Sequence, residues 1–380
     1  MAIYLDHHAT TPVDERVLEA MLPFFTERFG NASSRQHRFG WEANDAVERA
    51  RKQVAALIGA STREIVFTSG ATEANNLALK GAAEATRAKR DHIVTVATEH
   101  KAVLDPCKGL AQRGWRVSVL PVGADGLVDL RVVNEAVTDR TALVSVMAAH
   151  NEIGVLQPIR EIAAVAHAKG ALVHTDAVQA AGKVPVDVEA LDVDLLSMTA
   201  HKMYGPKGAG ALFVRRGLPA SLTPQIDGGG QERGLRAGTL NVPGIVGFGA
   251  AAEIARAEMP VESKRIAALR DRLLDRLRGA VEGITVNGSL TERLPGNLNV
   301  SFARVDGEAL LVGLDGVAVS SGAACTAAEP SHVLLALGLP KDRALASLRF
   351  GLGRWTTEAE IDEASRQIGA VVEQLQTLSV

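Results

Sequence analysis

The chain has 380 residues, 47% of them hydrophobic, so it can bury a full core and favours a division into two domains. Its net charge of −3, with both signs interspersed, argues against direct nucleic-acid binding and against binding to an anionic membrane. Two cysteines, Cys107 and Cys325, are too few for a disulfide framework and lack the spacing of metal ligands, so no metal site is expected.

The amino-terminal residues and the apolar segments do not resemble export or membrane signals. The opening sequence, MAIYLDHHATTP, has neither the basic region nor the long apolar core of a signal peptide. The most apolar segment, 242–257, is interrupted by Pro243, Glu253 and several glycines, so it is not typical of a membrane span. A chain with so few cysteines suits a reducing compartment. We therefore expect a cytoplasmic protein with no membrane partner.

The first part of the chain predicts two helices and then a regular alternation of strands and helices. Asp14 is expected to cap a helix that ends near Phe29, and a second helix, 41–59, ends at Gly59 as a C-cap. The alternation that follows is typical of a mostly parallel sheet with right-handed crossovers. The predicted strands are 64–68, 92–97, 116–121, 142–148, 171–173, 194–198 and 210–214, and the helices between them are 72–88, 102–113, 129–137 and 158–169.

The second part of the chain does not continue the regular alternation of strands and helices. The segment 227–244 is long, glycine-rich and charged, which suits a functional loop better than a linker. A long amphipathic helix is predicted near 262–281, and a smaller α+β unit follows it. The predicted strands of this unit are 284–287, 297–302, 317–320 and 347–351, and its helices are 307–314, 331–338 and 357–378.

Two of the predicted strands end on residues that suit one cofactor. Asp176 follows the strand 171–173, and Lys202 follows the strand 194–198. The carboxyl ends of parallel strands line the ligand crevice, and pyridoxal phosphate needs both an acid beside its ring nitrogen and a Schiff-base lysine. Taken alone, the pair is better explained by Asp176 as a helix N-cap and Lys202 as a solvated loop lysine.

The turn before the predicted helix 72–88 has the features of a phosphate cradle. Gly70 allows a close backbone turn, and the helix start offers amide hydrogens and a positive dipole end to an anion. The hydroxyls of Ser69 and Thr72 are further candidate donors. An ordinary helix cap explains the same motif equally well.

Three further residues are candidates for contacts with a cofactor or a substrate. His100 ends a strand, where it can stack on a planar ring and move protons near neutral pH. Asn151 ends the next strand and can donate to a ring oxygen or a carboxylate, although in isolation both residues are more simply loop and turn residues. Arg349, in an apolar strand, requires an anion, which is either a substrate carboxylate or an acid of the chain itself.

The two cysteines differ in their surroundings. Cys325 lies in SSGAACTAAEPS, a run of small residues that packs poorly and suits a nucleophile that must reach a substrate. Cys107 follows Pro106 within a helical pattern and is interpreted as a structural thiol.

Ten segments of the sequence together resemble the signature segments of the cysteine desulfurases of the NifS/IscS group. They occur in family order between residue 3 and about residue 375. They are YLDHHATTPVD, GNASSRQHRFG, FTSGATEANNLALKG, TEHKAVL, NEIGVLQPI, HTDAVQAAGKVPVD, AHKMYGPKGAGAL, GGGQERGLRAGTLNV, SSGAAC and LRFGLGR.

This resemblance implies a fold-type I enzyme dependent on pyridoxal phosphate. The implied architecture is α/β, with a mostly parallel seven-stranded sheet in a large cofactor-binding domain, 14–257. A smaller α+β domain, formed by 1–13 and 258–380, is implied to carry the catalytic cysteine loop.

The resemblance also implies a role for each residue that holds the cofactor. Lys202 is implied to be the Schiff-base lysine and Asp176 the partner of the ring nitrogen. Gln179 is implied to hydrogen-bond the ring hydroxyl, and His100 to stack on the ring and to shuttle protons with Lys202. Further cofactor contacts are implied for Ala71, Thr72, Asn151, Thr199 and His201.

The remaining implied roles concern the substrate, the sulfur and a second subunit. Asn151 and Arg349 are implied to hold the carboxylate of L-cysteine, and Cys325 to take its sulfur as a persulfide while L-alanine is released. Thr239 is implied to reach the phosphate in the neighbouring subunit of a homodimer with shared active sites. The persulfide is then passed to a sulfur-acceptor protein, for iron–sulfur cluster assembly or nucleic-acid thio-modification.

Two departures from the group qualify the expected partner. The run between Cys325 and Glu329 is shorter than in the members with the long mobile loop, so an accessory protein or a larger rearrangement is expected. The sequence stops at LQTLSV, without the longer tail that docks a scaffold in iron–sulfur assembly. A selenocysteine lyase, another pyridoxal-phosphate transferase and a catalytically idle scaffold subunit remain the alternatives.

Overall fold

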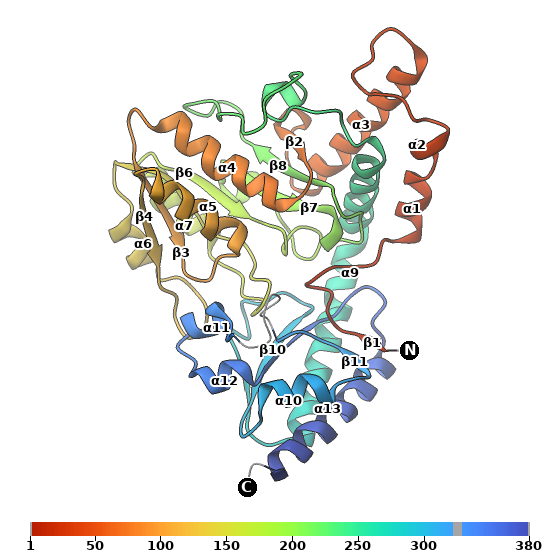
Figure 1. Cartoon of the computed structure of the whole chain (residues 1–380), viewed down its shortest axis with the longest axis vertical. Helices are drawn as coiled ribbons and strands as arrows, with labels where there is room; N and C mark the ends of the chain where they lie inside the picture. The colour runs from red at the N-terminus through yellow and green to blue at the C-terminus, as the bar shows by residue number, and fades with distance from the viewer. Residues whose placement is uncertain (1, 322–328, 379–380) are drawn as a thin grey trace.

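The computed structural model describes residues 2–321 and 329–378. Cys325 lies outside the described residues. The described chain forms a larger unit around one sheet and a smaller unit below it, and α9 (Val242–Ala280) runs through both (Figure 1). The carboxyl-terminal segments, drawn in blue, form most of the smaller unit.

The larger unit is built around a seven-stranded sheet, which confirms the predicted α/β class. Strands β4, β3, β5, β6 and β7 pair in parallel, whereas β8 is antiparallel to both β7 and β2. The sheet is therefore mostly parallel, as expected. In spatial order the strands are β2 (Ile65–Thr68), β8 (Gly210–Val214), β7 (Leu195–Thr199), β6 (Leu172–Asp176), β5 (Thr141–Ser145), β3 (His92–Val96) and β4 (Arg116–Leu120).

Helices cover both faces of this sheet, which explains why its inner strands are continuously apolar. In β3, Ile93 packs with Leu77 of α4 on one face, whereas Val94 packs on the other face in the core that contains Ile162 of α7 and Phe248 of α9. The helices of this unit before α9 are α1 (Glu15–Met21), α2 (Pro23–Thr26), α3 (Arg38–Leu57), α4 (Ala71–Thr86), α5 (Lys101–Gln112), α6 (Leu130–Ala136), α7 (Ile159–His167) and α8 (Val188–Leu191).

The first predicted helix is wrong in its extent. Asp14 does cap α1, because its carboxylate accepts a hydrogen bond from the Arg16 amide at 3.0 Å. The helix ends at Met21, however, with Leu22 as its C-cap, because Pro23 has no amide hydrogen to continue the ladder and instead starts the short α2. Phe25, four residues after the buried Met21, is 58% exposed.

Helix α9 is longer than the helix predicted near 262–281, because it already begins at Val242. Pro243 does not prevent this start, since the first turn of a helix needs no amide hydrogen from that residue. The first half of α9 packs into the core of the larger unit through Phe248, and the second half packs into a separate core through Leu273. The predicted domain boundary at 257/258 falls within this helix, so the two-domain division stays a prediction.

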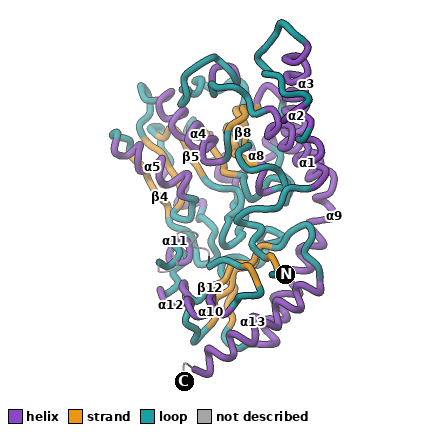
Figure 2. Tube along the Cα trace, turned by 45° about the vertical axis from the view of Figure 1, so that its right-hand side comes forward, coloured by secondary structure: helices purple, strands orange, loops and turns teal. Residues whose placement is uncertain are grey.

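The smaller unit surrounds this second core with two small sheets. In one, β10 lies between β12 and β9 with antiparallel pairing, and in the other Ile3 of β1 pairs in parallel with Val317 of β11. The amino-terminal segment therefore joins the carboxyl-terminal part of the chain (Figure 2). The elements are β1 (Ile3–Tyr4), β9 (Ile284–Val286), β10 (Asn297–Phe302), α10 (Gly307–Gly313), β11 (Val317–Ala318), α11 (His332–Ala336), α12 (Lys341–Leu345), β12 (Ser347–Gly351) and α13 (Glu358–Leu378).

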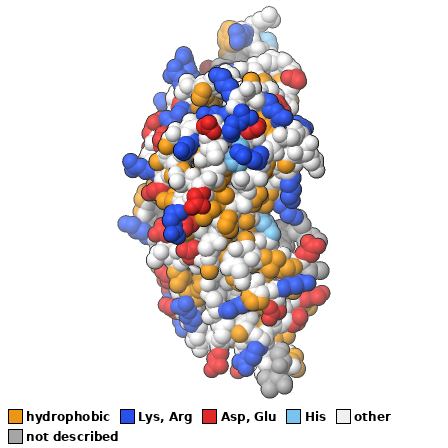
Figure 3. Space-filling model, turned by 90° about the vertical axis from the view of Figure 1, so that its left-hand side faces the viewer, with side chains coloured by type: hydrophobic (Ala, Val, Ile, Leu, Met, Phe, Trp, Pro, Cys, Tyr) orange, Lys and Arg blue, Asp and Glu red, His pale blue; other side chains and the backbone are white. Residues whose placement is uncertain are grey.

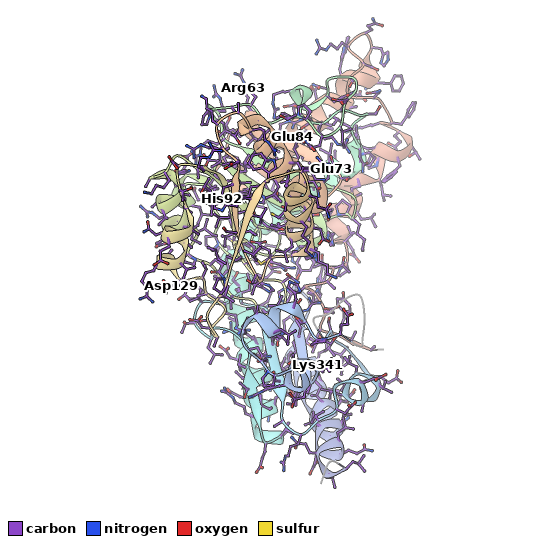
Figure 4. The ribbon with its side chains drawn as sticks, turned by 60° about the vertical axis from the view of Figure 1, so that its left-hand side comes forward. Arg63, Glu73, Glu84, His92, Asp129 and Lys341 are labelled. Carbon is purple, nitrogen blue, oxygen red and sulfur yellow. The ribbon has the colours of Figure 1, made fainter. Side chains whose placement is uncertain are left out.

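Charged side chains of both signs are interspersed on the face shown in Figure 3. Figure 4 places Glu73 and Glu84 on α4 of the larger unit and Lys341 on α12 of the smaller one; α12 is a short helix that the sequence patterns missed. Within residues 2–321 and 329–378, no helix is long and apolar enough to cross a membrane.

Candidate active site

A cavity of about 620 Å³ lies at the carboxyl ends of β6 and β7. Its wall includes residues from the larger unit, from the amino-terminal segment and from β12 of the smaller unit. The structure thus brings most of the predicted site residues together. Those that line the cavity are Ala71, Thr72, His100, Asn151, Asp176, Gln179, Thr199, His201, Lys202 and Arg349.

The acid of the site is the last residue of β6. Asp176 is buried, and its Oδ2 accepts a hydrogen bond from Asn75 Nδ2 at 2.7 Å, while its Oδ1 accepts one from the Val178 amide at 3.0 Å. Asn75 is itself buried on α4 and was not predicted. The carboxylate is therefore held rigidly at the strand end by two elements.

The lysine of the site is held beneath the amino-terminal segment. Lys202 follows β7, and its Nζ donates to the carbonyl oxygens of His8 and Ala9, each at 2.5 Å. Burial, and secondarily the charge of Arg349, lowers the pKa of Lys202 to about 8. Lys202 is thus not a solvated loop lysine, and an appreciable fraction of its amine is unprotonated near neutral pH.

The start of α4 faces the cavity without a side-chain cap. Gly70 is the N-cap residue and makes no such bond, and the Ser69 hydroxyl instead donates to Glu73 Oε2 at 2.5 Å. An ideal Cβ on Gly210 would lie 2.6 Å from Gly70 Cα, so this turn requires a glycine in the neighbouring strand. The amide hydrogens and the dipole of this 16-residue helix are available to an anion.

Two residues predicted to contact the cofactor, Thr199 and His201, make other contacts in the structure. The Thr199 hydroxyl donates to the Ala209 carbonyl at 3.0 Å and so does not offer its hydrogen to the cavity. His201 Nδ1 lies 3.2 Å from the Thr10 hydroxyl, and burial lowers the pKa of His201 to about 4. His201 is therefore neutral at neutral pH.

His100 and Arg349 lie at the wall of the cavity. His100 caps α5 by accepting the Ala102 amide at Nδ1, 3.0 Å away, and burial lowers its pKa against the opposing effect of Asp176. Arg349 pairs with Asp6 at 2.7 Å and donates to the main-chain oxygen of Asn151 at 3.2 Å. The internal ion pair considered from the sequence therefore exists, while the guanidinium also lines the cavity.

Two predicted residues stand apart from this cavity. Thr239 is exposed and does not line it. Cys107 is buried in a helix, and burial raises its pKa to about 12, as expected of a structural thiol. Cys325 lies outside the described residues.

Several contacting residues could not be identified from the sequence alone. Asp6, His8 and Asn75 lie far along the chain from Asp176 and Lys202, and only the folded arrangement shows which partners they meet. One feature of the sequence could have indicated these residues. They lie within YLDHHATTPVD and FTSGATEANNLALKG, two of the segments that carry the family resemblance.

The residues present fit pyridoxal phosphate. The uncapped start of α4 suits a phosphate, Asp176 is a buried acid beside the cavity, and Lys202 is an amine with a lowered pKa. This fold and this site define a fold-type I enzyme dependent on pyridoxal phosphate. The chain belongs to the aminotransferase class-V family, whose model matches residues 3–364.

Known relatives are similar over almost the whole chain. A protein of Anaeromyxobacter sp. (strain Fw109-5) named cysteine desulfurase IscS is 58% identical over 379 residues, covering 99% of this chain and 94% of that one. A solved structure described as a NifS-like protein has a TM-score of 0.92 and 41% identity, covering 98% of this chain and 100% of that one. Another, SspA in complex with cysteine, has a TM-score of 0.84 and 37% identity, covering 93% and 100%.

Proposed function

We propose that this protein is a cysteine desulfurase, which converts L-cysteine to L-alanine and keeps the sulfur as a persulfide on Cys325. The observation that carries the proposal is the convergence of Asp176, Lys202 and Arg349 on one cavity. Relatives that share more than half of the sequence bear this name, and a related structure contains cysteine. Pyridoxal phosphate supplies, when bound, the electron sink for the bonds that break at the substrate.

Different residues of the chain have different roles in this reaction. Arg349 binds the substrate carboxylate with Asn151, because a buried guanidinium at the wall of a cavity recognises such an anion. With pyridoxal phosphate bound, Asp176 would accept a hydrogen bond from the protonated ring nitrogen. Lys202 and His100 move protons at the substrate, since neither is held fully protonated near neutral pH.

Cys325 and the substrate supply all the atoms of the sulfur transfer. The Cys325 thiolate attacks the substrate sulfur, a new S–S bond forms, and the carbon–sulfur bond of the substrate breaks. The electron pair left on carbon is protonated to give L-alanine. The enzyme then carries a persulfide for a sulfur-acceptor protein, and iron–sulfur cluster assembly is the pathway that the name of the curated relatives supports.

We extend the proposal to a homodimer and to two domains per subunit. Thr239 is exposed and does not line the cavity of its own chain, which supports a contact with the phosphate in a second copy. The separate cores of the two units support domains at 14–257 and at 1–13 with 258–380.

The test uses the purified protein loaded with pyridoxal phosphate and given L-cysteine with a thiol reductant. We expect equal amounts of alanine and sulfide from the wild type, and neither product from Lys202→Ala. Cys325→Ser is expected to lose sulfide release, and Cys107→Ser, which changes the structural thiol, is the matched control. Sulfide release by Cys325→Ser at the wild-type rate would disprove the persulfide mechanism.

A further inference from the structure

A lysine that the proposed reaction does not use lies beside the cofactor cavity. Lys183 Nζ is 2.7 Å from Gln179 Oε1, four residues earlier in the turn after β6. The main chain of Lys183 is anchored as well, because its carbonyl oxygen accepts a hydrogen bond from Ser263 Oγ of α9 at 2.7 Å. The packing of the turn against α9 thus sets where this amine lies.

The carboxamide of Gln179 is held by contacts that fix its orientation. Its Oε1 faces Lys183 Nζ at 2.7 Å and His8 Nδ1 at 2.9 Å, while its Nε2 donates to the His8 carbonyl at 2.9 Å. The His8 carbonyl oxygen only accepts. Burial lowers the pKa of Lys183 to about 7, and the ammonium form of this side chain only donates. Rotating the amide by half a turn would place its NH₂ group against the Lys183 ammonium and its oxygen against the His8 carbonyl oxygen. One orientation of the amide is therefore strongly favoured.

The same contacts set the tautomer of His8. Because Gln179 Oε1 carries no hydrogen, the hydrogen of this 2.9 Å bond belongs to His8 Nδ1. His8 Nε2 is then bare, and it is buried without a hydrogen-bond partner among the described residues. Burial, together with the charges of Lys183 and Arg349, holds the pKa of His8 well below its usual range, so the ring stays neutral.

Gln179 is buried and lines the cofactor cavity, and its amide nitrogen has a second hydrogen beyond the one given to His8. We propose that Lys183 is a positioning residue that acts through Gln179, fixing its carboxamide so that an N–H and not the oxygen is presented to the cofactor. This inference rests on the proposed function, in which Gln179 contacts the ring hydroxyl. A donor at that place stabilises the ionised ring oxygen, whereas an acceptor opposes it.

The consequence is a shift in the titration of the bound cofactor. A stabilised ring oxygen holds the shared proton of the chromophore less tightly, so the contact lowers the pH at which the visible absorption changes. Loss of the Lys183 donor therefore raises this midpoint. The effect is a property of the cofactor environment and does not depend on the turnover of a substrate.

The test is a pH titration of the visible absorption of the loaded enzyme in four forms: the wild type, Lys183→Met, Gln179→Met and the double variant. We expect Lys183→Met to raise the midpoint by about one pH unit, a tenfold change in proton affinity. In the Gln179→Met background the same substitution should add no further shift, because its effect passes through the amide. An unchanged midpoint, or an equal shift in both backgrounds, overturns the proposal.

Two further variants separate orientation from charge and from misfolding. Lys264→Met, at an exposed lysine beside Ser263, is the matched control and should leave the midpoint unchanged. Lys183→Gln keeps a donor without the charge, so a midpoint near that of the wild type supports the proposal and a shift of the size seen with methionine overturns it. This variant also serves if Lys183→Met does not fold.

The outcomes distinguish this inference from the proposed function. A wild-type protein that develops no visible band with pyridoxal phosphate contradicts the proposed function itself. A normal band whose midpoint is unaffected by Lys183→Met contradicts only the role of Lys183.

Discussion

Lys202 is partly buried and has two carbonyl acceptors, and its charge state decides how fast it can bind the cofactor. Burial and the charge of Arg349 lower its pKa from 10.5 to about 8. Only the unprotonated amine attacks an aldehyde, and below its pKa this form decreases about tenfold for each pH unit.

We therefore predict that uptake of pyridoxal phosphate by the cofactor-free protein accelerates about tenfold from roughly pH 6 to pH 7 and levels off above about pH 8 to 9. Stopped-flow absorbance in the visible range measures this rate. Lys202→Ala should show no such phase. A rate that still increases tenfold between about pH 9 and pH 10 would indicate a lysine with its ordinary pKa.

A second residue with a shifted pKa, Glu152, links stability to pH. It is buried next to Asn151, and its carboxylate accepts the Ser331 hydroxyl at 2.5 Å. Burial raises its pKa from 4.5 to about 7, against the opposing effects of Ser331 and Arg349. The folded state thus holds a proton that the unfolded chain releases, so this group lowers stability as the pH increases from about 4.5 to about 7.

Glu152→Gln removes this titration while keeping an oxygen for Ser331. We expect the variant to resemble the wild type near pH 5 and to be more stable at pH 8, by about 1–3 kcal/mol. Chemical denaturation at the two pH values measures the difference. Equal stabilities at pH 8 would show that Glu152 ionises in the folded protein without cost.

At the scale of elements, the loop 227–244 is held in place by one buried ion pair. The Glu232 carboxylate accepts hydrogen bonds from both terminal guanidinium nitrogens of Arg51 on α3, each at 2.7 Å. Its Oε2 also accepts a hydrogen bond from the Phe67 amide of β2 at 2.7 Å. Arg51 lies 4.6 Å from the Phe67 ring centre. Glu232 and Arg233 adopt positive φ angles of 48° and 57°, so the pair stabilises a strained turn.

Glu232→Ala removes the buried carboxylate that pairs with Arg51, which keeps Glu48 and the Ile65 carbonyl, and it leaves the Phe67 amide without this acceptor. We predict a loss of about 3–5 kcal/mol in the free energy of unfolding, the typical cost of breaking a buried pair from one side. The control is Glu363→Ala, because Glu363 pairs with Arg366 on the exposed side of α13 and should cost less than about 1 kcal/mol. Similar losses in both variants, measured by urea denaturation, would contradict this assignment.

The sequence patterns predicted the larger unit well because its signals are local and repeated. Strands buried on both faces, such as β3 and β5, give short apolar runs. Asp14, the N-cap of α1, and Gly59, which has a φ of 69° just after the Ile58 C-cap of α3, are visible as single residues. The extent of α9 could not be predicted, because its first half is apolar on most sides and its second half is amphipathic. Its continuity follows from packing into two cores, which no local pattern contains.

The site divides in a similar way. Asp176 and Lys202 could be located because strand ends in a parallel sheet converge. The contacts of Lys202 with His8, of Asp176 with Asn75 and of Arg349 with Asp6 could not be predicted, because they join segments separated by up to 343 residues. Thr199 shows a second limit, since a hydroxyl can lie at the cavity and still donate to a main-chain oxygen.

At the scale of the whole molecule, the surface around α1 to α3 is unusually apolar for a single chain. Phe25, Phe29, Phe39 and Trp41 are each at least half exposed. Trp41 also lines a second cavity of about 850 Å³, formed between α3 and the loop 227–244. Large exposed aromatic side chains mark interaction surfaces, and their continuity with the loop that carries Thr239 supports a second copy as the partner.

A mixed dimer tests whether this partner completes the active site. In the proposed arrangement Lys202 of one subunit and Thr239 of the other serve the same cofactor. Lys202→Ala removes the amine, and Thr239→Glu places a negative charge against the phosphate, so each homodimer should be inactive. A dimer with one subunit of each kind retains one site with both native residues and should recover about half of the wild-type activity.

The matched control pairs Lys202→Ala with Asp176→Ala. These two residues line the same cavity of one chain, so their mixed dimer has a defect in both sites and should stay inactive. Differently tagged subunits, expressed together and purified through both tags, provide the two mixed dimers. If the dimer of Lys202→Ala with Thr239→Glu is no more active than its control, Thr239 does not act across the interface, and the site is complete within each chain.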